Sequence, residues 1–140
     1  MLKNKKRIFP MKESKLIENA MKCFKRKLPT LYHFKAHGEP MQVRGVPDII
    51  ASMEGLFVGI EFKIMRSGKL NVTPYQEYTL TKVYESKGAA FVFWFDEKTG
   101  EYGVQIHRFK TLDEAVDFVL AEVIAIKKSV WANMGDKNGL

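Results

Sequence analysis

The sequence predicts an α/β fold, an α+β arrangement in which helices flank a mixed β-sheet. Three observations lead to it. Apolar residues recur at helical spacing near the N-terminus, two short apolar runs are joined by Glu54-Gly55, and residues 89–95 form a near-continuous apolar run. The last pattern is typical of a strand in a sheet that is covered on both faces. The expected order is helix, three strands, helix, strand, strand, helix.

The N-terminal third should contain an arm, a helix and a strand. Residues 1–11 (MLKNKKRIFPM) are predicted to form a loose basic arm. Residues 12–28 carry Ile17, Ala20, Met21, Phe24 and Leu28 on one helical face, and the helix should stop at Pro29. The short aromatic segment 31–36 reads as a strand, and residues 37–45 (HGEPMQVRG) as a loop.

A hairpin and a capped helix should follow. Residues 49–53 (IIASM) and 56–64 (LFVGIEFKI) are strands joined by a tight Glu54-Gly55 turn. Thr73 can cap the next helix, Pro74 suits its first position, and Gln76 could close a capping box. This second helix should end near Gly88.

The remaining residues should complete one domain over residues 12–128. The apolar strand 89–95 is followed by a turn and by a single last strand over residues 102–109. Thr111 and Glu114 form another capping-box pattern, which opens a helix to about Lys128. Residues 129–140 are expected to be a frayed tail.

Composition narrows the class of protein. The chain has 140 residues, 46% of them apolar, which suits one globular domain. It has no apolar run of membrane-spanning length and no signal-peptide core, so a cytoplasmic location is expected. The single cysteine, Cys23, excludes an internal disulfide and a cysteine-based zinc site, and a buried, inert thiol is the favoured interpretation.

The net charge of +7 is concentrated at the N-terminus. Residues 1–30 contain ten Lys or Arg against Glu13 and Glu18, whereas the remaining residues carry a balance of −1. Clustered basic groups favour a nucleic-acid partner because they displace counterions from phosphates. The alternative is a basic tail that only aids solubility.

The predicted hairpin places two carboxylates side by side. If Met53 faces Leu56, then Asp48 faces Glu61, and directly opposed residues point to the same face. Lys63 shares that face, whereas Leu56, Val58, Ile60, Phe62 and Ile64 form the apolar face.

Two opposed carboxylates are destabilising unless a proton, a lysine or a cation neutralises them. Oxygen ligands from two strands suit Mg²⁺, which often binds one or two carboxylates plus a substrate phosphate. The alternative is an exposed strand face on which Lys63 offsets Glu61 and Asp48 is a turn residue after Pro47.

These residues carry a family resemblance. RGVPDIIASMEGLFVGIEFK resembles the core of the PD-(D/E)XK nuclease superfamily, which has a restriction-endonuclease-like fold. GVPD together with the downstream TPYQ and KGAAFVFW is similar to the virus-type replication-repair nuclease (VRR-NUC) family, over about residues 18–95. The resemblance implies a core of helix, three strands, helix and strand. It also implies metal-dependent hydrolysis of DNA phosphodiester bonds, leaving 5′-phosphate and 3′-hydroxyl ends.

The resemblance also implies roles for individual residues. Asp48 and Glu61 would bind Mg²⁺, or Mn²⁺ in its place, with the backbone carbonyl of Phe62. Lys63 would position the attacking water and stabilise charge on the phosphate. Gln76 would lie beside the site, a role compatible with capping, and Glu18 matches the acid of the first helix, as a less certain catalytic and metal-binding residue.

Basic residues are the candidates for contacts with DNA: Arg7, Lys22, Lys25, Arg26, Lys35 and Arg44. For Lys35, a phosphate contact and an ordinary surface position are equally compatible with the pattern. His33, His37 and His107 lack ligand spacing and are interpreted as structural.

The resulting hypothesis is an endonuclease that selects branched DNA, such as four-way (Holliday) junctions. Stand-alone members of the family resemble small homodimeric resolvases, and a phage origin with action in the bacterial cytoplasm fits that resemblance. The alternatives are a less selective nicking or flap endonuclease, a catalytically silent DNA-binding module with this fold, and a scaffold with a basic tail.

Overall fold

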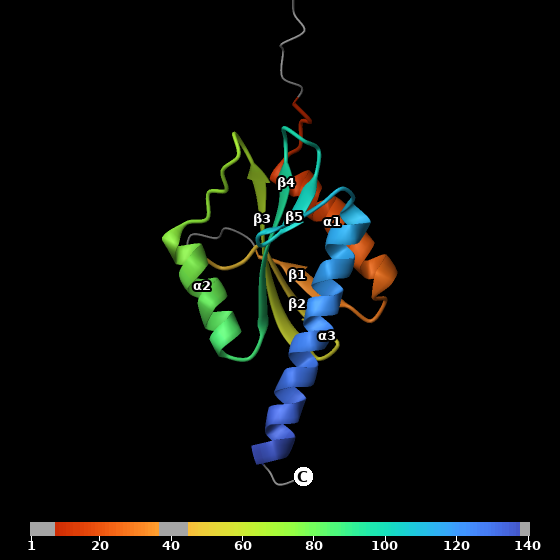
Figure 1. The fold of residues 1–140 in the computed structure, drawn as a ribbon, viewed down its shortest axis with the longest axis vertical. Helices are drawn as coiled ribbons and strands as arrows, with labels where there is room; N and C mark the ends of the chain where they lie inside the picture. Colours follow the sequence, from red (N-terminus) through yellow and green to blue (C-terminus); the bar gives the residue numbers. More distant parts are fainter. Residues whose placement is uncertain (1–7, 37–44, 138–140) are drawn as a thin grey trace, which may run out of the picture.

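The structure is a computed structural model that describes residues 8–36 and 45–137. These residues form a six-stranded mixed sheet, in the order β1-β2-β3-β4-β5-β6, with three helices (Figure 1). The helices are α1 (Glu13–Lys27), α2 (Pro74–Glu85) and α3 (Leu112–Lys137). The strands are β1 (Tyr32–Lys35), β2 (Ile49–Met53), β3 (Leu56–Met65), β4 (Ala89–Asp96), β5 (Tyr102–Val104) and β6 (His107–Phe109). The predicted α/β fold is confirmed.

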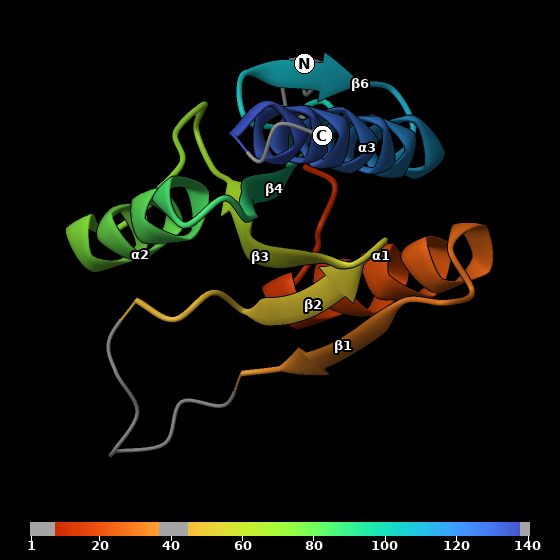
Figure 2. The ribbon, with the colours of Figure 1, turned by 90° about the horizontal axis from the view of Figure 1, so that it is seen from below.

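The helices cover the two faces of the sheet unequally. Helices α1 and α3 pack on one face, and α2 packs on the other, next to β3 and β4 (Figure 2). The main core lies under α1 and α3, where Leu16, Phe24, Val116 and Val119 are fully buried. Within the described residues, no helix is both long and apolar enough to cross a membrane.

The central hairpin has the predicted turn and register. Glu54 and Gly55 both have positive φ, 53° and 80°, as a two-residue type I′ turn requires. Met53 lies opposite Leu56, and Ile49 lies opposite Ile60. The strand limits agree with the prediction to within one residue.

Helix α2 connects β3 to the parallel strand β4 and has the predicted cap. The Thr73 hydroxyl accepts a hydrogen bond from the backbone N–H of Gln76 at 3.2 Å. The Gln76 side chain in turn accepts one from the backbone N–H of Thr73 at 2.9 Å. The helix ends at Glu85, slightly before the predicted limit at Gly88. In the parallel pairing that follows, Phe62 lies opposite Phe93.

The prediction of one strand over residues 102–109 is wrong, because β5 and β6 form a second hairpin there. Gln105 adopts a left-handed backbone conformation with φ 56° and ends β5. Its side-chain oxygen accepts a hydrogen bond from the backbone N–H of Val92 at 2.8 Å. This contact with the neighbouring strand holds the turn.

Helix α3 continues to Lys137 instead of ending near Lys128. Residues 129–137 are therefore helical and not a frayed tail. Neither glycine nor proline interrupts the sequence between Lys128 and Gly135, so the helix can propagate. Figure 1 shows this part of α3 extending beyond the sheet.

The described part of the N-terminal arm is attached to the sheet. The backbone N–H of Phe9 donates to the carbonyl oxygen of Glu97 at 2.7 Å, and Met11 packs against the core. Residues 8–11 are thus not loose, and residues 1–7 of the predicted arm lie outside the described residues. The predicted loop at 37–45 also lies outside them, except for Gly45.

Candidate active site

The hairpin register brings Asp48 and Glu61 together on the face of the sheet that carries α2. Asp48 directly precedes β2, and its carbonyl oxygen accepts a hydrogen bond from Ala36 at 2.9 Å. Its carboxylate Oδ2 accepts one from the backbone N–H of Phe62 at 2.8 Å. The Asp48 side chain is therefore held across β3, beside Glu61.

Glu61 is an ionisable side chain buried without full compensation. It is only 2% exposed, and its Oε2 atom has no hydrogen-bond partner within the described residues. Burial, a hydrogen bond with the Asp48 carboxyl group and the charge of Asp48 raise the pKa of Glu61 to about 9, against the opposing charge of Lys63. Glu61 thus holds a proton near neutral pH, or a cation must neutralise the pair.

The alternative of a solvent-exposed strand face is therefore wrong for Glu61, although the turn position after Pro47 describes Asp48 correctly. Lys63 lies on the same face of β3 and is half-buried. Its charge lowers the pKa of Glu61, but burial and Asp48 outweigh it. Lys63 therefore does not neutralise Asp48 and Glu61 fully, and a bound cation could supply the remaining positive charge.

The first helix contributes an acid to this environment, but it is Glu13 and not Glu18. The charge of Glu13 raises the pKa of Glu61 slightly. In the sequence, Glu13 precedes the buried Leu16 and Ile17 by three and four residues, on the same helical stripe. That spacing was the signal that could have identified it.

Glu18 lies elsewhere on α1. Its carboxylate binds Lys22 at 3.1 Å and Lys15 at 3.5 Å, and these lysines lower its pKa. It lines a hollow between α1 and β1, together with Lys35. The structure therefore does not bring Glu18 into the group formed by Asp48, Glu61 and Lys63.

Gln76 lies at the first turn of α2, which packs against the segment leading to Asp48. Gly45 has φ 82°, and a Cβ atom there would collide with the carbonyl of Tyr75 and approach the backbone nitrogen of Gln76. Only glycine permits this close contact. The Gln76 side-chain oxygen closes the capping box, so its observed role is structural.

The predicted DNA-contacting residues separate into groups. Lys22, Lys25 and Lys35 line the same hollow between α1 and β1. Arg26 instead donates a hydrogen bond to Asp113 at 3.1 Å. The two remaining candidates, Arg7 and Arg44, lie outside the described residues.

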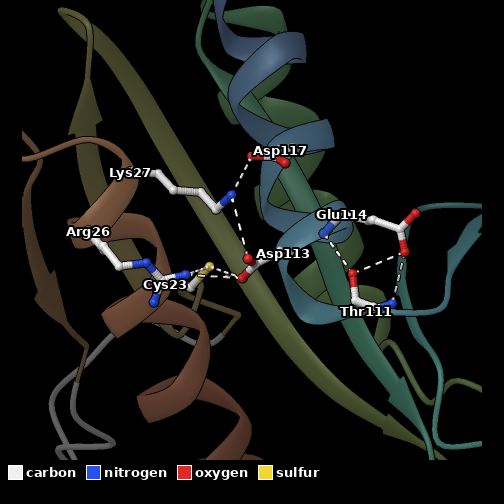
Figure 3. Close-up of polar contacts among 7 residues, drawn as sticks. All are labelled: Cys23, Arg26, Lys27, Thr111, Asp113, Glu114 and Asp117. Atoms are coloured by element: carbon white, nitrogen blue, oxygen red, sulfur yellow. Dashed lines mark hydrogen bonds and ion pairs between the residues drawn. The ribbon is translucent and has the colours of Figure 1, made fainter.

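Arg26 belongs to a polar cluster between α1 and α3 (Figure 3). The Cys23 thiol donates to Asp113 at 3.2 Å, and Lys27 pairs with Asp117 at 2.9 Å. Burial, together with the hydrogen bond and the charge of Asp113, raises the pKa of Cys23 to about 11. The thiol is buried and protonated, as the prediction of an inert cysteine requires.

The start of α3 beside this cluster carries the predicted second capping box. The Thr111 hydroxyl accepts a hydrogen bond from the backbone N–H of Glu114 at 3.2 Å, and the Glu114 carboxylate accepts one from the backbone N–H of Thr111 at 3.1 Å (Figure 3). The cap fixes where α3 begins, and thereby where Asp113 meets α1.

The carboxylate pair fits a divalent cation that is only partly held by protein. Within the described residues, no group of three or more His, Cys, Asp or Glu side chains could hold a metal ion. Two carboxylates, one with a buried oxygen that lacks a partner among the described residues, suit Mg²⁺ if water and a substrate phosphate complete its coordination.

No protein-family model matches the chain, and no curated protein matches it. Among solved structures, the chain is similar to Hjc, a Holliday junction resolvase from the archaeal hyperthermophile Archaeoglobus fulgidus. The TM-score is 0.47 and the sequence identity 16%, over 76% of this chain and 88% of that one.

Proposed function

We propose that the chain is a metal-dependent nuclease of the PD-(D/E)XK type that hydrolyses phosphodiester bonds in DNA. The observation that carries the proposal is the carboxyl pair of Asp48 and Glu61, with Glu61 buried and its Oε2 atom lacking a partner in the described residues. A fold gains no stability from an uncompensated buried carboxyl group, and such groups concentrate at functional sites.

The chain's own residues have separable roles in this chemistry. Asp48 and Glu61 would hold the cation, and the Phe62 N–H fixes the orientation of Asp48. When bound, a divalent cation neutralises the pair and makes water more acidic for attack on phosphorus. Lys63, on the same face, stabilises negative charge that develops on the phosphate oxygens. Gln76 would border the substrate while it caps α2, because the first turn of that helix packs against Gly45, three residues before Asp48.

The substrate class we favour is branched DNA, cut to leave 5′-phosphate and 3′-hydroxyl ends. The positive charge of residues 1–30 would bind phosphates without reading base sequence. A homodimer would present two sites to two strands of a four-way junction. The same proposal includes membership of the VRR-NUC family, use of Mg²⁺ and a phage origin. Its support is the resemblance of the GVPD, EFK and TPYQ segments to that family.

The test is cleavage of a labelled four-way junction beside a linear duplex, with Mg²⁺ or with EDTA. We expect paired symmetric nicks in the junction, lost in EDTA and reduced at least about a hundredfold in Asp48→Ala and Glu61→Gln. Glu77→Gln, an exposed acid of α2, is the matched control and should retain full activity.

Other outcomes separate the alternatives. Equal cutting of both substrates would keep the nuclease and remove the preference for junctions. Binding without cutting in Mg²⁺ or Mn²⁺ would contradict the nuclease and favour a silent DNA-binding module.

A further inference from the structure

A hollow of about 430 Å³ lies between α1 and the edge strand β1. Four basic side chains line it: Lys22 and Lys25 from α1, and His33 and Lys35 from β1. Lys22 and Lys25 are three residues apart and share one helical face, and alternate residues of β1 point to the same side. The four side chains therefore converge because of the helical spacing in α1 and the alternation of side chains along β1.

The floor of the hollow is apolar. It is formed by Ile17 and Met21 of α1 and Ile49 of β2, all buried. Basic groups above an apolar floor suit a ligand with a negative charge at one end and a flat apolar surface at the other. A nucleotide has both parts, its phosphate and its base.

The hollow has an excess of positive charge. Among the described residues that line it, the one acid is Glu18, which is already bound to Lys22 and Lys15. Lys25 and Lys35 are exposed and make no ion pair within the described residues. Burial lowers the pKa of His33, and the charge of Lys25 lowers it further, so this lysine lies near the imidazole. A phosphate would relieve the repulsion among these groups.

The hollow lies at the same end of the sheet as the carboxyl pair, but on the opposite face. Ile49 on its floor directly follows Asp48, and Lys35 lies opposite Ile49 in the β1–β2 pairing. Consecutive strand residues point to opposite faces, so Asp48 and Ile49 serve the two sites separately. The carboxyl pair and the hollow are therefore separated by the sheet itself, next to its edge strand β1.

The size of the hollow limits the ligand. Its volume is within the roughly 300–1,000 Å³ of pockets that take one small ligand. A single nucleotide fits such a space, whereas a stiff double helix cannot turn around one strand to enter it.

We propose that this hollow binds one nucleotide of an unpaired strand that continues from the cleavage site. Its phosphate lies between Lys25 and Lys35, and its base rests on the apolar floor beside His33. The proposal rests on the nuclease function proposed above. Within the branched DNA favoured there, it makes forms with an unpaired strand next to the cleaved bond the better substrates.

The test is equilibrium binding in EDTA, measured by fluorescence anisotropy with a labelled oligothymidylate and with a blunt duplex, over a range of salt concentrations. The variant is Lys25→Gln combined with Lys35→Gln. The matched control is Lys110→Gln with Lys128→Gln, which removes the same charge from exposed lysines outside the hollow.

We expect the hollow variant to bind the single strand about tenfold more weakly. The slope of log K against log salt should fall by about 0.7, because the hollow contacts one phosphate and each single-strand phosphate contact contributes about 0.7. The affinity of the hollow variant for the duplex should change by less than about twofold. The affinities of the control variant for single strand and duplex should change equally little.

Equal losses for single strand and duplex, or equal losses in variant and control, would overturn the proposal. Cleavage by the wild type, run in parallel on a splayed duplex with Mg²⁺, separates it from the proposed function. If the wild type cuts nothing but the hollow variant still loses single-strand binding selectively, the proposed nuclease function is wrong and the single-strand site stands. If the wild type cuts DNA but the hollow variant binds single strands as the wild type does, the nuclease function stands and the single-strand site is wrong.

Discussion

The two faces of strand β3 differ sharply in what they bury. Toward α1 and α3, the strand presents Val58, Ile60 and Phe62, all fully buried in an apolar core. Toward α2, it presents Phe57, which is 50% exposed, and Glu61, which is 2% exposed. The core face thus buries only apolar side chains, whereas the other face buries a carboxyl group and leaves an aromatic ring half-exposed.

This contrast separates stability from function within a single strand. Burial of apolar side chains stabilises the fold, whereas burial of a carboxyl group without full compensation opposes it. The α1 side therefore holds the protein together, and the α2 side carries a cost that a proton or a bound cation offsets. Substitutions on the two faces should have effects of opposite sign.

The largest effect is expected from Phe62→Ala on the core face. Phe62 packs against Phe93, with ring centroids 5.4 Å apart, and its truncation leaves a cavity. We expect a loss of about 3–5 kcal/mol in the free energy of unfolding, measured by urea denaturation. Phe57→Ala on the other face is the control and should cost less than about 1 kcal/mol. Similar losses in both variants would mean that the faces do not differ in this way.

The next effect, of opposite sign, is expected from Glu61→Gln in metal-free protein. The folded state raises the pKa of Glu61 from 4.5 to about 9, so between these values it binds more protons than the unfolded state does. Stability of the wild type should therefore fall as the pH rises from about 5 to 9. At pH 8 the variant should be more stable, on the order of 2 kcal/mol, because Glu61 must take up a proton when the wild type folds, whereas glutamine is neutral in both states.

Urea denaturation of both proteins across this pH range measures the difference. The pH profile should be flatter in Glu61→Gln than in the wild type. A variant that is less stable than the wild type at pH 8 would show that the buried carboxyl group supports the fold.

A smaller effect is expected from divalent cations. Mg²⁺ bound to the folded state alone stabilises it by about 1.4 kcal/mol at ten times its dissociation constant. We expect a rising thermal midpoint in the wild type and no change in Asp48→Asn or Glu61→Gln. This readout does not depend on catalysis. An equal rise in all three proteins would indicate binding elsewhere.

Local patterns were sufficient to predict the carboxyl pair. The Glu54-Gly55 turn and the alternation of residues 56–64 fix the register, and the register fixes which residues face Asp48. The capping box at Thr73 and Gln76 was equally readable, because all its atoms lie within one helical turn.

Contacts between distant segments limited the rest. The turn at Gln105 depends on its hydrogen bond to Val92, thirteen residues away, so a continuous strand was the natural expectation. Glu18 and Glu13 are both acids of an amphipathic helix, and the spacing of Glu13 from Leu16 and Ile17 becomes decisive once the packing of that helix is known. His33 lacked any ligand spacing because most of its neighbours in the hollow come from α1, far from it in the sequence.

The smallest effect is expected far from both faces, in the cluster between α1 and α3 (Figure 3). Asp113→Asn weakens exposed ion pairs with Arg26 and Lys27, so the change in unfolding midpoint should be small and should vanish at high salt. It should nevertheless change the chemistry of Cys23. Burial, the main cause of the raised pKa of the thiol, stays, but the contribution of Asp113 is removed. Alkylation by iodoacetamide should therefore begin at a lower pH than in the wild type, with DNA cleavage unchanged. An unchanged alkylation profile would mean that burial alone keeps the thiol protonated, and a loss of cleavage would connect this cluster to the α2 face.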